Sequence, residues 1–396
     1  MSRLKIVLAP DSFKGSLSAS GVCDAMEAGI RRVCPDAEIV KVPMADGGEG
    51  TVEALVSSTG GRIEKATVAG PLGDPVEAFY GILGDSMTAV IEMAAASGLP
   101  LVPPEKRNPL KTTTYGTGQL MLAALEKGCR RLIIGIGGSA TTDCGTGMAQ
   151  ALGVRFFRRD GEEISGYMNG ERMVDVERID LAHRHPLVSE AEITAACDVD
   201  NPLLGPCGSV YTYSRQKGAT DEQLAILEAN MESIIGVVET ATSKTVRDTP
   251  GAGAAGGLGA GLMAFAGADL RPGIRLVLDA CGFREKISGA SLIFTGEGKV
   301  DWQTAFGKTI SGVAGEAKQQ SIPVIVIAGA VGDDTDELYD IGVTSLFSIC
   351  SMPMNLDEAM KHADVLIQRS VERVMRLACV SSGCSHTLSR RNENWS

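Results

Sequence analysis

The chain has 396 residues, more than the roughly 250–300 residues at which a single hydrophobic core stops growing, so we expect two domains. Hydrophobic residues make up 44% of the chain and charged residues 22%, which excludes a disordered or fibrous protein. The net charge is -12 and no basic run is longer than two residues, which argues against binding to duplex nucleic acid.

The sequence offers no segment suited to a signal peptide or a membrane span. The apolar run Ile6–Ala9 is too short for a signal peptide. Gly251–Ala268 is long and uncharged, but it consists mostly of glycine and alanine. The ten cysteines include no Cys-x-x-Cys pair, so we expect reduced thiols and a cytoplasmic location.

Two strand–loop–helix units are expected at the start of the chain. Lys5–Ala9 is a β-branched run that predicts a strand, and apolar residues at helical spacing follow its loop. Glu38–Pro43 predicts a second strand, followed by a loop and by a helix that Thr51 caps and Gly60 ends. Two successive units of this kind predict a parallel sheet.

Between residues 62 and 93 the pattern changes to short strands broken by glycine and proline, which predicts antiparallel hairpins. Buried strands are then expected at Arg131–Ile136 and Glu192–Ala196, and helices at Gln119–Lys127 and Asp221–Thr240. The alternation of strands and helices returns near the end of the chain, with three strands and a last helix: Ser291–Thr295, Pro323–Ala328, Thr344–Ile349 and Leu356–Ala378.

These patterns predict an α/β protein with two domains. The first is a Rossmann-like parallel-sheet domain assembled from both chain ends, residues 1–66 and 290–378. The second is an α/β domain inserted between them, residues 67–289. Residues 379–396 form a polar tail to which we assign no function.

Three glycine-rich segments resemble nucleotide-binding motifs, but none is complete. Gly135–Ala140 fits G-x-G-x-x-G/A after a strand, although Cys144–Gly147 would interrupt the following helix. This loop suits a dinucleotide site, a nest of N–H groups that binds phosphate or carboxylate, or simple tight packing. Gly251–Gly256 follows no strand, and close helix packing is the simpler interpretation. Phe306–Thr309 lacks the first glycine of a P-loop, because that position is Trp302.

Charged residues gather in the loops after three predicted strands. Open α/β sheets bind their ligands at the carboxyl ends of the strands. Carboxylates hold Mg²⁺ and lysines neutralise phosphate, so such a set suits phosphoryl transfer. The set contains Asp11, Ser12 and Lys14 after the first strand, Asp46 and Glu49 after the second, and Glu297, Asp301 and Lys308 after Leu292–Phe294.

Asp198 directly follows the strand predicted at Glu192–Ala196. It is a candidate general base, and the alternative is that it merely forms the turn that ends at Asn201-Pro202. The four histidines have no spacing typical of a zinc site or of a His-based triad, so we expect neither.

Long blocks of the sequence resemble the bacterial-type glycerate kinases, a two-domain α/β family. The resemblance runs from Leu4 to Ala378 and departs from the family pattern in two places. Thr142 and Cys144 stand where Asn and Gly are expected, and Tyr213–Arg215 replaces a Phe-Gly-Pro run. A cysteine adopts positive φ less readily than glycine. The blocks that carry the resemblance are Ala9–Leu17, Pro43–Val52, Ile91–Leu99, Asn108–Gly118, Ile134–Met148, Cys197–Gly205, Gln216–Thr220, Gly251–Gly261 and Thr295–Thr309.

The resemblance implies a kinase that phosphorylates D-glycerate with ATP in a cleft between two domains. It favours O2 of glycerate, and hence 2-phosphoglycerate as the product. Two other functions stay open from the residues. One is a nicotinamide-dependent hydroxyacid dehydrogenase that uses Gly135–Ala140 and Asp160, and the other is a metabolite-binding protein without turnover. The chain could also form a homo-oligomer.

We assign roles in an ATP- and Mg²⁺-dependent kinase as hypotheses. Lys14 pairs with the glycerate carboxylate or the transferring phosphoryl group, and Asp198 is the general base. Asp46 and Glu297 hold Mg²⁺. The remaining candidates bind substrate or phosphate, and they are Asp11, Ser12, Gly137, Gly138, Ser139, Asn201 and Lys308.

Overall fold

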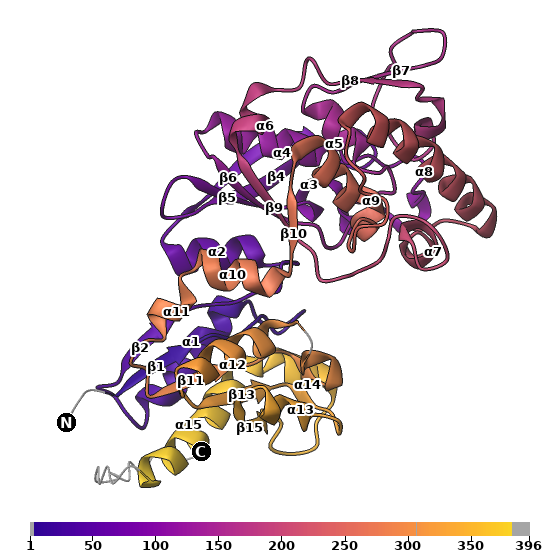
Figure 1. Ribbon diagram of the computed structural model, residues 1–396. Helices are drawn as coiled ribbons and strands as arrows, with labels where there is room; N and C mark the ends of the chain where they lie inside the picture. The colour runs from indigo at the N-terminus through magenta and orange to yellow at the C-terminus, as the bar shows by residue number, and fades with distance from the viewer. Residues whose placement is uncertain (1–3, 306, 382–396) are drawn as a thin grey trace. The chain divides into compact units, whose positions relative to one another are not determined.

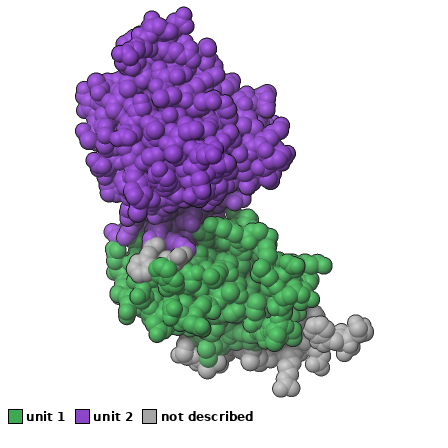
Figure 2. All heavy atoms as spheres, turned by 90° about the vertical axis from the view of Figure 1, so that its right-hand side faces the viewer, with its two compact units in different colours: residues 1–41, 286–305, 313–396 green, residues 42–285, 306–312 purple. Residues whose placement is uncertain are grey.

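The computed structural model describes residues 4–305 and 307–381 of the chain. These residues form two compact units, drawn as a ribbon in Figure 1 and in two colours in Figure 2. Of the described residues, unit 1 contains 4–41, 286–305 and 313–381, and unit 2 contains 42–285 and 307–312. Residues 42–66, which we expected in the first domain, group with the inserted segment in this division.

The sheet of unit 1 has five parallel strands in the order β15-β13-β11-β1-β2 (Figure 1). β1 lies between β11 and β2, so strands from the two ends of the chain are hydrogen-bonded neighbours. The predicted parallel sheet built from both chain ends is therefore confirmed. Its strands are Lys5–Leu8 (β1), Glu38–Lys41 (β2), Leu292–Thr295 (β11), Val324–Ala328 (β13) and Val343–Ser348 (β15).

One face of this sheet packs on two long helices, α1 (Ala19–Arg31) and α15 (Ala363–Ser381). Ile6 and Leu8 of β1 belong to that core. Val7 between them is also fully buried, so both faces of the strand are covered, as is usual for a parallel sheet.

The predicted C-terminal helix at 356–378 is in fact two helices, so this prediction was wrong in one respect. α14 (Leu356–Lys361) ends at His362, whose φ of -112° and ψ of 19° are not helical, and α15 starts directly after it. Between β11 and β15 the chain also forms α12 (Thr309–Gln319), α13 (Glu337–Asp340) and the short strands β12 (Lys299–Val300) and β14 (Ala330–Val331).

The sheet of unit 2 is mixed and has the order β10-β9-β6-β5-β4-β3. β3, β4 and β5 pair antiparallel, as the hairpin pattern predicted, whereas β5, β6, β9 and β10 are parallel. The carboxyl ends of four strands therefore lie at one edge. The strands are Arg62–Ala69 (β3), Pro75–Ile82 (β4), Thr88–Glu92 (β5), Arg131–Gly135 (β6), Glu192–Ala196 (β9) and Asp269–Arg271 (β10).

Two hydrophobic clusters fill unit 2, one against the sheet and one around the long helix α8. No helix among the described residues is long and apolar enough to cross a membrane. The helices between β2 and β11 are Thr51–Thr59 (α2), Ala94–Ser97 (α3), Tyr115–Glu126 (α4), Thr146–Ala151 (α5), Pro186–Glu190 (α6), Ser209–Tyr213 (α7), Asp221–Thr242 (α8), Ala254–Gly261 (α9), Gly273–Ala280 (α10) and Phe283–Lys286 (α11).

Local sequence sets the ends of α2 and α8. The Thr220 hydroxyl accepts from the N–H of Gln223, whose side chain accepts from the N–H of Thr220, and this capping box starts α8 where the sequence predicted. α2 begins after Gly50, which has a left-handed φ of 89°. Thr51 is its first residue and donates to the carbonyl of Gly48 at 2.7 Å, so the predicted Thr51 cap was wrong.

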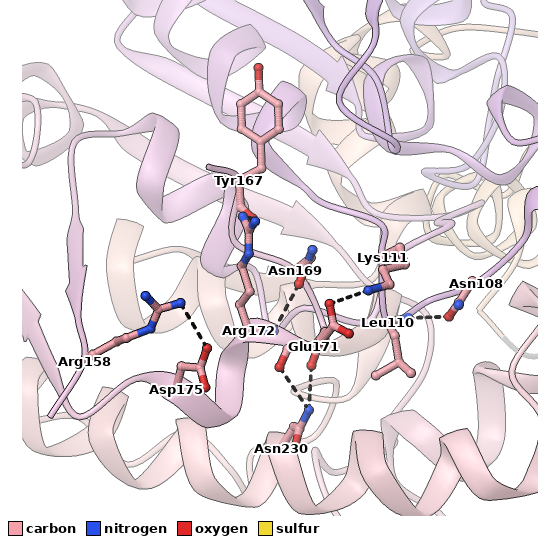
Figure 3. Close-up of polar contacts among 11 residues, drawn as sticks. Asn108, Leu110, Lys111, Arg158, Tyr167, Asn169, Glu171, Arg172, Asp175 and Asn230 are labelled. Atoms are coloured by element: carbon pink, nitrogen blue, oxygen red, sulfur yellow. Dashed lines mark hydrogen bonds and ion pairs between the residues drawn. The ribbon is translucent and has the colours of Figure 1, made fainter. Parts of the chain in front are cut away.

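A loop before β8 (Arg178–Asp180) is fastened to α8 (Figure 3). Asn230 of α8 is buried, and its amide donates to the carbonyls of Gly170 at 2.9 Å and Glu171 at 3.5 Å. A β-carbon at Gly170 would lie 2.8 Å from the carbonyl oxygen of Thr142. The loop thus packs directly on the segment that carries Thr142.

Candidate active site

The loops that follow β1 and β11 meet at one edge of the unit 1 sheet. These two strands are neighbours in the sheet. After β1 the chain continues to β2 on one side of the pair, and after β11 it continues to β13 on the other side. The N–H of Asp11 donates to the carbonyl of Gly296 at 2.8 Å, and the hydroxyl of Thr295 donates to the carbonyl of Ala9 at 2.7 Å. Open α/β sheets bind ligands at such a switch point.

Asp11, Ser12 and Lys14 lie on the first of these loops. Asp11 is buried, and its Oδ1 accepts from the N–H of Ser12 at 2.6 Å, whereas Lys14 is exposed. A β-carbon at Gly298 would lie 3.8 Å from the nitrogen of Lys14, so the two loops are in van der Waals contact. This edge of unit 1 therefore combines a buried carboxylate with an exposed ammonium.

Glu297 and Asp301 lie on the second loop and share a hydroxyl. Thr304 donates to Oε1 of Glu297 at 2.8 Å and accepts from the N–H of Asp301 at 3.2 Å. Lys299 also forms an ion pair with Asp301 at 3.1 Å. Thr304 therefore fixes the position of Glu297 relative to the backbone of Asp301.

Asp46 lies in unit 2, on a loop that crosses the carboxyl ends of β6 and β9. A β-carbon at Gly47 would be 2.6 Å from the Cβ of Ala196, the last residue of β9. One at Gly135, the last residue of β6, would be 2.5 Å from the carbonyl oxygen of Gly47. The carboxylate of Asp46 accepts from the N–H of Gly48 at 3.2 Å, which orients it at this edge.

Asp198 lies at the same edge, just after β9. Its Oδ1 accepts from the N–H of Gly273, the first residue of α10, at 2.8 Å, which is a contact outside its own turn. The side chain is open to solvent, but the protein around it desolvates the carboxylate and raises its pKa to about 6. The N–H of Gly273 opposes this shift and the charge of Asp46 adds to it. Such a carboxylate is ionised at pH 7 and suits a general base.

Residues 135–147, the glycine loop, follow β6 at this edge. Gly137 and Gly138 are exposed, whereas the residues after them are buried. The N–H groups of Gly137, Gly138 and Ser139 donate none of the hydrogen bonds found among the described residues. Three successive N–H groups of this kind suit an anion such as phosphate or carboxylate.

Asp143 anchors the buried half of the glycine loop. It is fully buried, and it accepts from the N–H and hydroxyl of Thr114, both at 2.8 Å, and from the N–H groups of Gly145 at 3.1 Å and Gly147 at 3.3 Å. Burial raises the pKa of Asp143, and these four donors oppose the shift. Because Asp143 is buried and accepts from all four of these donors, we interpret it as a residue that stabilises the loop.

The glycine loop does not lead into the helix of a dinucleotide-binding motif. Cys144 and Gly145 both have positive φ, 54° and 67°, and α5 begins only after them. Cys144 thus occupies a left-handed position that favours glycine, at a cost of about 1–2 kcal/mol. The fingerprint at Gly135–Ala140 therefore lacks its helix.

The glycines near α9 serve close packing, as the simpler interpretation predicted. A β-carbon at Gly256, where φ is +73°, would lie 1.9 Å from the carbonyl oxygen of Thr141. One at Gly261 would lie 2.5 Å from the carbonyl oxygen of Cys144. The backbone of α9 therefore packs directly on the glycine loop near both ends of the helix.

Two departures from the family pattern meet in the structure. The hydroxyls of Thr142 and Ser214 are 3.0 Å apart and buried. The resemblance led us to expect Asn and Gly at these positions, so relative to that expectation a smaller side chain at 142 is matched by a larger one at 214. Ser214 therefore packs against Thr142 of the glycine loop.

Three further candidates remain to be placed, and they are Asn201, Lys308 and Asp160. The Asn201 amide donates to the carbonyl of Cys207 at 2.7 Å and accepts from the hydroxyl of Tyr213 at 2.6 Å, so it holds its own loop together. Lys308 is half-buried just before α12, in the part of the chain that belongs to unit 2. Asp160 accepts from the N–H of Glu162 at 2.9 Å in an exposed turn. Phe306 of the P-loop comparison lies outside the described residues.

Sequence reasoning missed Lys217, which lies between α7 and α8. Its side chain is 2% exposed, and Nζ donates to the carbonyl of Thr141 in the glycine loop at 2.6 Å. Burial lowers the pKa of Lys217 to about 7, and the charge of Asp143 opposes this. Its presence in the block Gln216–Thr220 was the available signal.

The candidates fall into two groups, one in each unit. Asp46 and Lys308, which the sequence placed at the edge of the first sheet, group with Asp198 in unit 2. Asp46 does so because the chain leaves that sheet after β2, and Lys308 because residues 307–312 belong to unit 2. Among residues 4–305 and 307–381, no three His, Cys, Asp or Glu side chains are arranged to hold a metal ion. Unit 1 contains Asp11, Ser12, Lys14 and Glu297, and unit 2 contains Asp46, Gly137, Gly138, Ser139, Asp198, Asn201 and Lys308.

Comparison with known proteins shows to which family the chain belongs. Residues 6–379 match the model of the glycerate kinase family. The chain belongs to that family. This glycerate kinase family member is 48% identical over 377 residues to a glycerate kinase of Halalkalibacterium halodurans, covering 95% of the chain and 98% of the relative. It is 49% identical over 360 residues to a glycerate 2-kinase of Escherichia coli, covering 91% and 94%.

A solved structure supports the same assignment. A crystal structure of a Salmonella typhimurium LT2 protein is 44% identical and superposes with a TM-score of 0.87, covering 96% of this family member and all of that chain. Since the family consists of kinases, the protein is a phosphotransferase that uses ATP. The dehydrogenase and the binding protein without turnover are thereby set aside.

Proposed function

We propose that the chain transfers the γ-phosphoryl group of ATP to O2 of D-glycerate, giving 2-phosphoglycerate and ADP. The name of the E. coli relative supports the choice of O2. The observation that carries the proposal is that Asp198 and the glycine loop follow the neighbouring parallel strands β9 and β6, and therefore leave the unit 2 sheet at the same edge. A base and an anion site on one edge suit an alcohol that also carries a carboxylate.

Each group has a proposed role in this reaction. Asp198 accepts the proton of the glycerate hydroxyl as its oxygen bonds to the γ-phosphorus, and the bond from that phosphorus to the bridging oxygen of ADP breaks. The N–H groups of Gly137, Gly138 and Ser139 bind phosphate oxygens or the substrate carboxylate. Lys14 compensates charge on the transferring group or the carboxylate, and Asp11, Ser12 and Lys308 support binding of substrate or phosphate.

Mg²⁺ suits the carboxylates present, because it binds through one or two of them and otherwise through water and phosphate. Asp46 and Glu297 are the proposed ligands, as in the hypothesis from the sequence, since each is oriented by a neighbouring N–H or hydroxyl. The ion would neutralise phosphate charge. A dedicated cage of three or more side chains is not needed for this.

The test is ADP release on addition of D-glycerate, followed through a coupled assay. We expect turnover with ATP and Mg²⁺, and phosphorus NMR of the product should show 2-phosphoglycerate. A product that is only 3-phosphoglycerate would overturn the choice of O2. Binding of D-glycerate without ADP release would overturn the proposed reaction.

A further inference from the structure

The glycine loop is held along its length by backbone and side-chain contacts, and one of these contacts comes from a buried ammonium. Gly138 accepts from the N–H of Leu99 at 2.9 Å, and the N–H of Cys144 donates to Gly256 at 3.0 Å. These are backbone contacts, and the hydroxyl of Thr112 also donates to the carbonyl of Ala140 at 2.8 Å. Between them lies Thr141, whose carbonyl accepts from a buried ammonium.

Burying the ammonium of Lys217 to satisfy the single carbonyl of Thr141 costs free energy. Taking an ammonium out of water is unfavourable unless it is paired, and the donor could have been a neutral group. The lowered pKa of Lys217 reflects this burial, and Asp143 is the charged group that acts against it. A residue that costs stability in a folded protein is commonly retained for function.

No other side chain takes over this task. The Thr141 hydroxyl is itself buried and has no hydrogen-bond partner among the described residues. Gly256 packs against the same carbonyl but contributes no side chain. Within the part of the chain that the structure describes, Lys217 is thus the side-chain donor to the Thr141 carbonyl, and Thr112 is the donor to the preceding carbonyl of Ala140.

We propose that Lys217 is a positioning residue for phosphoryl transfer, whose ammonium fixes the Thr141 peptide and keeps the N–H groups of residues 137–139 directed at the bound anion. Lys217 is too buried to touch a substrate, so it acts through the glycine loop. The proposal rests on the proposed function for its catalytic consequence, and on the contact with Thr141 for its structural part.

Amide hydrogen exchange of the apo protein tests the structural part without any assay of activity. Ala140 and Cys144 are informative, because their N–H groups are hydrogen-bonded to Ser97 and Gly256. In Lys217→Met we expect both amides to exchange at least tenfold faster. The matched control is Lys244→Met, since Lys244 also donates to a carbonyl, that of Met263 at 2.8 Å, away from the loop. Unchanged exchange in Lys217→Met would overturn the proposal.

Steady-state kinetics tests the catalytic part. In Lys217→Met, KM for ATP or for D-glycerate should rise tenfold or more while kcat changes less, and Lys244→Met should keep both values. Lys217→Arg retains the charge and the donors and should recover part of the loss. If Lys217→Met fails to fold, Lys217→Gln takes its place in both experiments. Unchanged KM values would overturn the catalytic role, whereas a wild type without turnover would count against the proposed function and leave the exchange result standing.

Discussion

The two groups of candidate residues use different parts of the polypeptide. In unit 1 the loops after β1 and β11 present side chains, such as exposed Lys14 and Glu297, which accepts from the hydroxyl of Thr304. In unit 2 the glycine loop presents backbone N–H groups, and its buried half is fixed by Asp143 and Lys217. A substitution in unit 1 should therefore remove charge and leave the fold intact, whereas one near the glycine loop should disturb the fold as well.

Asp198 offers the largest effect and is the exception within unit 2, because it is an accessible side chain for which we propose a chemical role. Asp198→Asn keeps the acceptor for Gly273 but cannot take a proton, so kcat should fall about 10²–10⁴-fold. The melting temperature and ATP affinity should hold. Asp200→Asn, an exposed neighbour on the same loop, is the control. Wild-type kcat in Asp198→Asn across neutral pH would make Asp198 structural.

Lys14→Met tests the unit 1 half of the comparison. Loss of the ammonium should lower kcat/KM by about 10²–10³, because charge in the transition state loses its partner. The fold should be unaffected, since Lys14 is exposed. Lys5→Met, at the opposite end of β1, is the control. Near-normal turnover, or a melting temperature that drops with activity, would break the distinction between the two groups.

Gly256→Ala tests the backbone packing in unit 2. The new methyl group would meet the Thr141 carbonyl at 1.9 Å with φ at +73°, so the free energy of unfolding should drop by about 3 kcal/mol or more. Gly161→Ala separates strain from collision, because its φ is +86° and nothing lies within 4 Å. That control should lose about 1–2 kcal/mol. Equal losses in urea titrations would show that packing on the loop is unimportant.

The smallest expected change is in the pKa of Asp198 in the apo Asp46→Asn variant, and it sharpens the view of the unit 2 edge. The pKa of Asp198 is about 6, so its base form, and with it kcat/KM, should decline as pH falls through 6. Removing the charge of Asp46 removes one cause of this raised pKa, so the pKa should move down. Carboxyl-carbon NMR of the apo protein, assigned with Asp198→Asn, measures this without turnover. An unchanged or higher pKa would contradict the coupling.

The sequence was informative wherever structure is local. The apolar run at Arg131–Ile136 and the glycine breaks between residues 62 and 93 give strands almost where they lie. It could not place Asp46, because β2 ends at Lys41 and nothing in the next five residues shows that the chain joins another unit. The contacts of Asp198 with Gly273 and of Lys217 with Thr141 span 75 and 76 residues, and such pairs follow no local pattern.

The central place of β1 in its sheet has a consequence for synthesis. β1 and β2 leave the ribosome first, but their neighbour β11 starts only at Leu292. At ordinary elongation rates residues 42–291 take roughly 10–50 s to add. During that time unit 2 can fold as an almost continuous piece of chain, while the N-terminal strands have an unpaired edge. Unit 1 is thus the unit whose synthesis begins earlier, and it is also the unit whose sheet is completed later.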